Sequence, residues 1–226
     1  MPERVKIDLG FADLLCRKSD ATTISRTAKS AYSFNRRFFE TDIKRKFKII
    51  ICYSRKELDK EWGGPTESWL VACADYGRIA TFPDRLIRKY SPRKDVGNLQ
   101  SMLNHEISHQ FYYQIVKGCK PSWLIEGLAT QIDGYGLNRA DNRLLKRQRP
   151  PLLYSHTGKT YWKHAEFLYP MGHAAVTYLM RKHGKAKMLR LLALYSKTRT
   201  KKGFEAAFRK TFGYSVKELE ERVFGR

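Results

Sequence analysis

The stretch "LQSMLNHEISHQFYYQIVKG", residues 99–118, constrains the fold more than any other part of the sequence. His105, Glu106 and His109 lie on or beside an apolar stripe, and burying three ionisable groups is costly unless something pairs with them. The stretch therefore predicts a helix that needs a charged partner from elsewhere in the chain. Apolar residues at spacings of three and four, typical of an amphipathic helix, mark its stripe: Leu99, Met102, Leu103, Phe111, Ile115 and Val116.

Residues 105–109 match the pattern H-E-x-x-H. Histidines at positions i and i+4 lie one turn apart on one helical face, so both imidazoles can bind a single zinc ion at about 2.0–2.1 Å. Glu106 is turned about 100° from His105, which suits it to take a proton from a water that the metal activates. We expect His105 and His109 to bind zinc and Glu106 to act as the base. The alternative is an ordinary helix whose histidines are capped by carbonyls or water.

A third zinc ligand is expected in "WLIEGLAT", residues 123–130. Glu126 shares a predicted helical face with Trp123, Ala129 and Thr130, and a carboxylate on such an inward stripe is unusual unless a cation meets it. A turn through residues 118–121 is long enough to bring it level with the histidines. Three protein ligands and one open position are the pattern of catalytic zinc, so we expect one Zn²⁺ per chain. The alternative is an acid that is exposed or paired with arginine.

The remaining pattern predicts an α+β fold. A helix is expected within residues 20–42, a buried strand within 44–54, a short helix at 55–64 and a hairpin within 68–84. Residues 135–163 lose periodicity, and four helices separated by glycines or turn residues should follow them. We expect a single domain, 1–226, with a sheet and zinc-helix part at 1–134 and a helical part at 135–226.

Charge is the main compositional signal. The chain has 44 Lys and Arg against 22 Asp and Glu, a formal net charge of +22, with clusters at 44–46, 144–149 and 197–202. Such a field attracts acidic proteins, nucleic acids or anionic surfaces. The four cysteines form no C-x-x-C pair, so reduced thiols are expected. Because we find neither a leader pattern nor an apolar run long enough to span a bilayer, we expect a soluble, cytoplasmic protein.

The two metal-ligand motifs together resemble those of a known family. "HEISHQF" followed by "WLIEGLAT" is similar to the gluzincin zinc metallopeptidases, in particular the peptidase MA-like family, which is related to the catalytic domains of aminopeptidase N and, more distantly, thermolysin. A strand, a hairpin, the two metal helices, "YPMGHAAVTYLMRKHG" and "GFEAAFRKTFGYSVKELEERV" follow in the order that group shows, from about Phe47 onward. The resemblance implies a zincin-like metallopeptidase fold with a small mixed sheet, a hairpin edge strand and a helical C-terminal part.

The resemblance also implies roles for individual residues. His105, His109 and Glu126 would be zinc ligands, and Glu106 would return the proton to the leaving amine. Thr130 would lie beside the ligands. Tyr169 in "YPMG" would donate to the oxyanion that develops during hydrolysis, with His173 and His164 as alternatives. An edge strand would pair with an extended substrate, and its residues would be Gly77, Arg78, Ile79, Ala80 and Thr81.

The expected function is zinc-dependent hydrolysis of peptide bonds in peptide or protein substrates, including acidic ones. Aminopeptidase N relatives carry a G-x-M-E-N stretch before the zinc helix, whose Glu binds the substrate's free amine, and the corresponding region here has no Glu. An endopeptidase is therefore expected over an aminopeptidase.

Three alternatives remain. One is a gluzincin fold that has lost its activity or keeps a latent site. Another is a basic protein associated with nucleic acid, with a structural or latent zinc site; structural zinc is usually closed by a fourth ligand, which argues against it. The last is a protease that acts on substrates bound to nucleic acid. The SprT-like repair proteases also carry H-E-x-x-H but use a third His, and the next histidine along this chain is His156, without a matching context.

Overall fold

The structure is a computed structural model, and it describes residues 3–90, 97–118, 120–134, 136–147 and 165–225. Contacts divide the chain into two compact units, Met1–Gln114 and Ile115–Arg226, and we describe each by itself. The division falls before the helix that contains Glu126, whereas the sequence suggests a boundary after residue 134. That helix packs closely on a later helix, described below, which explains the difference.

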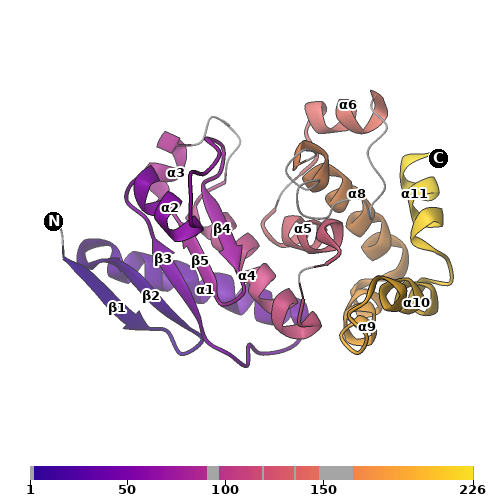
Figure 1. The fold of residues 1–226 in the computed structure, drawn as a ribbon, viewed down its shortest axis with the longest axis horizontal. Helices are drawn as coiled ribbons and strands as arrows, with labels where there is room; N and C mark the ends of the chain where they lie inside the picture. The colour runs from indigo at the N-terminus through magenta and orange to yellow at the C-terminus, as the bar shows by residue number, and fades with distance from the viewer. Residues whose placement is uncertain (1–2, 91–96, 119, 135, 148–164, 226) are drawn as a thin grey trace. The chain divides into compact units, whose positions relative to one another are not determined.

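The first unit is built on a five-stranded mixed sheet (Figure 1). The strand order is β1-β2-β3-β5-β4; β3 is parallel to both of its neighbours, β2 and β5, and the two outer pairs are antiparallel. Alternate residues of β2 are fully buried, which places that strand firmly in the core. The strands are β1 (Arg4–Asp8), β2 (Ala12–Arg17), β3 (Phe47–Ile51), β4 (Ala72–Asp75) and β5 (Arg78–Thr81).

The predicted hairpin at 68–84 is present, but the expectation about its edge is wrong. Strand β5 lies between β3 and β4, with Ile49 opposite Ile79 in the parallel register. The segment Gly77 to Thr81 is therefore interior, and β4 is the strand at this edge of the sheet that the structure describes. The error has a simple cause, because the sequence reveals a hairpin without revealing which of its arms pairs with the rest of the sheet.

In the first unit α1 packs on α4, the helix that contains the H-E-x-x-H residues. The Phe39 ring of α1 stacks on Phe111 of α4 with centroids 5.3 Å apart, and Asn35 Nδ2 donates to the Asn104 carbonyl at 3.0 Å. Residues 105–112 of α4 are all buried, so its centre is covered on every side and is not simply amphipathic. The helical segments are η1 (Lys18–Asp20), α1 (Ala21–Phe39), α2 (Arg55–Trp62), α3 (Asp84–Tyr90) and α4 (Leu99–Val116).

The second unit is helical in its described residues. Trp123 and Phe204 are fully buried, with ring centroids 6.2 Å apart, and mark its core. The four predicted C-terminal helices are present, and α6 lies in a stretch for which we expected no periodic structure. The helices are α5 (Ser122–Ile132), α6 (Arg139–Arg147), α8 (Ala165–His183), α9 (Lys185–Tyr195), α10 (Lys201–Phe212) and α11 (Val216–Phe224). Within the described residues, none of the helices combines the length and apolar character needed to cross a bilayer.

The backbones of α5 and α8 touch at two glycines. A Cβ atom on Gly127 would lie 2.3 Å from the Gly172 carbonyl oxygen, and one on Gly172 would lie 2.5 Å from the Trp123 carbonyl oxygen. Neither distance is compatible with a side chain, so both positions require glycine for the helices to come this close. Glu126 precedes one of these glycines, and Tyr169 lies one turn before the other.

We predict that Gly172→Ala destabilises the protein by about 1–3 kcal/mol, because the new methyl group meets backbone atoms that cannot move independently of their helices. Urea unfolding followed by circular dichroism measures the change. Gly136→Ala is the matched control, since a Cβ at Gly136 meets nothing within 4 Å. Equal stability of the two variants would contradict the close helix contact.

Candidate metal centre

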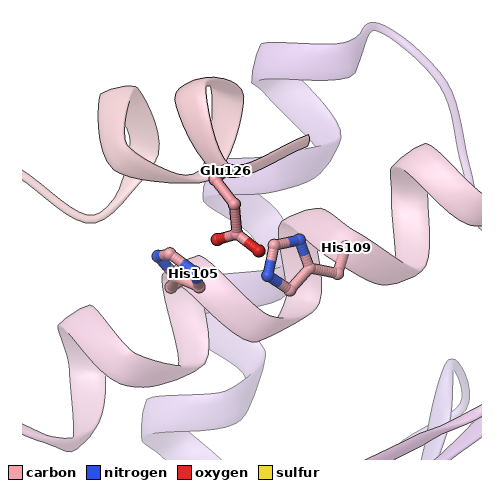
Figure 2. Close-up of side chains that lie close together, drawn as sticks. All are labelled: His105, His109 and Glu126. Atoms are coloured by element: carbon pink, nitrogen blue, oxygen red, sulfur yellow. The ribbon is translucent and has the colours of Figure 1, made fainter. Parts of the chain in front are cut away.

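Three side chains predicted to bind metal come together in the structure. His105 and His109 project from α4 and Glu126 from α5, and their nearest ligand atoms all lie within 4.8 Å of one another (Figure 2). The two imidazole rings lie 4.8 Å apart between centroids and are mutually perpendicular. All three residues are buried, at 8%, 6% and 7% exposure, so the alternative of an exposed Glu126 is wrong.

This donor set fits zinc. Two imidazole nitrogens and a carboxylate oxygen are ligands that zinc accepts, and three protein ligands leave a position for water or substrate. Ligand atoms bound to one tetrahedral zinc at about 2.1 Å lie about 3.4 Å apart, so small side-chain rotations that draw the three donors together would close the group on one ion. Because burying these groups without a cation is costly, the donor chemistry and the burial favour the same interpretation.

Glu106 is buried beside this group without belonging to the donor set. Its carboxylate is close enough to Cys73 of β4 to affect that thiol: burial, and then the charge of Glu106, raise the pKa of Cys73 to about 12. The expected base is therefore within electrostatic range of the edge strand. Cys73 is a free thiol, as are Cys16 and Cys52, while Cys119 lies outside the described residues.

Two of the other expected site residues, Thr130 and Tyr169, lie on helices of the second unit. Thr130 is fully buried, and its hydroxyl donates to the Gly127 carbonyl at 2.9 Å, which fixes its orientation along α5. Tyr169 is half-buried near the start of α8, before Pro170. His156 and His164 lie outside the described residues.

His173, the alternative oxyanion donor, has a partner that the sequence did not suggest. Gln131 Nε2 lies 3.1 Å from His173 Nδ1 and donates to Thr177 Oγ1 at 2.8 Å. If the Gln131 amide nitrogen donates to the ring, Nδ1 is the acceptor and Nε2 of the neutral ring carries the proton. Burial lowers the pKa of His173, which favours the same neutral form.

Comparison with solved structures identifies the fold. An M1 zinc metallopeptidase from Deinococcus radiodurans matches 99% of this chain over 52% of its own, with a TM-score of 0.56 and 17% identity. A point mutant of that enzyme matches 100% of this chain over 53% of its own, with a TM-score of 0.57 and 17% identity. The chain thus has the fold of zinc metallopeptidases and spans about half the length of these structures. No family model and no curated protein matches the sequence.

We predict that Glu126→Gln weakens zinc binding by at least about 100-fold. Mutation of a residue that only hydrogen-bonds to a metal ligand already lowers metal affinity by about 10–100-fold, and loss of the ligand itself should cost more. Metal content after dialysis against a zinc buffer measures the loss. Glu220→Gln is the matched control, because Glu220 is an equally buried glutamate of α11 at 5% exposure. If both variants kept stoichiometric zinc, Glu126 would not be a ligand.

Proposed function

We propose that this chain is a zinc-dependent peptidase in which His105, His109 and Glu126 hold the metal. The single observation that carries the proposal is the buried group of two imidazoles and one carboxylate. The Glu106 carboxyl lies on α4, the helix that contributes both imidazoles. The likeness of the fold to an M1 zinc metallopeptidase supports it. Three donors in the group, among the residues that the structure describes, favour a catalytic site over a structural site closed by four.

The residues of the chain have distinct tasks in this mechanism. Zinc, when bound, supplies a Lewis acid that polarises the peptide carbonyl and makes water more acidic. Glu106 removes a proton from the attacking water and delivers it to the amine as the peptide bond breaks. The Tyr169 hydroxyl donates to the oxyanion of the tetrahedral intermediate, with the Nε2 proton of His173 as the alternative donor. In either case α8 supplies the donor.

Substrate recognition is assigned to the edge strand β4. An edge strand presents backbone N–H and C=O groups that an extended peptide can pair with. The side chains of Cys73 and Ala74 are small and half-buried, so they leave the strand accessible to a peptide backbone. Burial, and then the charge of Glu106, raise the pKa of Cys73, which agrees with a base that acts near β4.

Endopeptidase action is favoured by the charges on this strand. An exopeptidase that binds a free amino terminus needs a carboxylate for it, and Asp75 is the only acid of β4. Its carboxylate is exposed and already forms an ion pair with Arg78 across the hairpin.

The net charge of +22 favours acidic protein or peptide substrates, which the field of the protein would attract.

We predict that Glu106→Gln lowers kcat by about 10²–10⁴-fold while zinc stays bound, because the amide cannot accept the proton. Cleavage of a quenched-fluorescent peptide library and metal analysis of the same sample measure the two effects. Glu220→Gln again serves as the control and should cleave at the wild-type rate. Zinc loss from Glu106→Gln would show instead that this residue supports the metal.

We also predict that peptides with acetylated amino termini are cleaved at least as well as their free counterparts, since β4 offers no uncommitted carboxylate for an amine. Mass spectrometry of matched peptide pairs identifies the bonds cut. Release of single residues from free peptides, with the acetylated partners intact, would assign the chain to the aminopeptidases.

A further inference from the structure

The tip of the β4–β5 hairpin is attached to α4 by one buried side chain, that of Gln110. The Gly77 amide donates to Gln110 Oε1 at 3.0 Å. Gln110 Nε2 donates in turn to the Asp75 carbonyl at 2.7 Å and to the Arg78 carbonyl at 3.3 Å. The carboxamide thus bonds to three of the backbone groups at the turn, and it is only 1% exposed.

The position of Gln110 in the sequence links the hairpin to the candidate metal ligands. It directly follows His109 on α4, and Asp75 is the last residue of β4. One rigid side chain therefore joins the helix that carries both histidines to the end of the edge strand. Aromatic contacts follow the same route: Tyr76 of the turn lies 6.1 Å from Tyr113, whose ring stacks on His109, also at 6.1 Å between centroids.

We infer that Gln110 is a positioning residue that fixes the edge strand β4 relative to the histidines of α4, and through β4 fixes where the peptide substrate lies. The inference rests on the proposed function, because it takes β4 as the strand that binds the peptide. If β4 shifts relative to the histidines, it pairs less well with a peptide that reaches the site, and the lost backbone hydrogen bonds weaken substrate binding. Three hydrogen bonds from one buried carboxamide are suited to prevent such a shift.

The chain contains a matched comparison one helical turn later. Gln114 accepts hydrogen bonds from the amides of Lys44 and Arg45 at 2.9 and 3.0 Å, and donates to the Arg45 carbonyl at 2.8 Å. It therefore also makes three hydrogen bonds to backbone from the same helix, although it accepts two and donates one where Gln110 accepts one and donates two. Its target is the connection between α1 and β3, which is not part of the edge strand.

The test replaces each glutamine by methionine, which keeps the length of the side chain and removes the hydrogen bonds. We expect Gln110→Met to raise KM for a peptide substrate by about tenfold with little change in kcat, and to retain zinc. Gln114→Met should leave KM unchanged. Gln110→Glu can still accept from Gly77 but turns an acceptor oxygen toward the two carbonyls, so its KM should rise at least as much as that of Gln110→Met.

A second measurement does not depend on peptidase activity. Hydrogen exchange at the Gly77 amide should be at least about tenfold faster in Gln110→Met than in wild type, and unchanged in Gln114→Met. Unchanged exchange at Gly77 in Gln110→Met, or equal KM values for the two methionine variants, would overturn the inference. Absence of wild-type cleavage would instead defeat the proposed function, while the exchange data would still decide whether Gln110 holds the hairpin. If Gln110→Met does not fold, Gln110→Leu provides both measurements, because it also removes the hydrogen bonds without burying a charge.

Discussion

The structure depends on the burial of ionisable side chains at the centre of α4. His105, Glu106 and His109 are each at most 8% exposed, in a stretch of the helix that is buried on every side. Removing such groups from water is tolerated only when opposite charge or hydrogen bonds compensate for it. A divalent cation held by the two imidazoles and the Glu126 carboxylate would supply that compensation, and three protein ligands would leave a coordination position for water or substrate.

Two kinds of backbone contact hold the elements that carry the site. In the second unit, α5 and α8 meet at Gly127 and Gly172 without intervening side chains, which fixes the helix of Glu126 against the helix of Tyr169. In the first unit, Gln110 joins α4 to the hairpin tip through hydrogen bonds to backbone atoms. Both contacts are stiff, because neither relies on a flexible surface side chain. Catalytic groups need such support to stay within a fraction of an ångström of a productive geometry.

Local features of the sequence predicted most of the helices and the three side chains that come together as a candidate metal site, because periodicity, capping and metal-ligand spacing are encoded in neighbouring residues. Features that depend on distant pairing were missed. Strands β1 and β2 are short and lie in a segment for which we made no prediction, and α6 lies in a stretch without an apolar period. The order of β4 and β5 and the role of Gln110 could not be read from the sequence, since each depends on which distant segment the hairpin contacts.

The most direct test of the central claim is X-ray absorption at the zinc K-edge of the purified, tag-free protein. We predict one zinc per chain with only nitrogen and oxygen neighbours at about 2.0–2.1 Å, and the multiple-scattering signal of two imidazoles. The Glu126→Gln variant should retain less zinc, and any zinc that it retains should have a different set of neighbours in its spectrum. Sulfur neighbours at about 2.3 Å, or a protein that retains no zinc, would contradict the account, because the ion would then not be held by His105, His109 and Glu126.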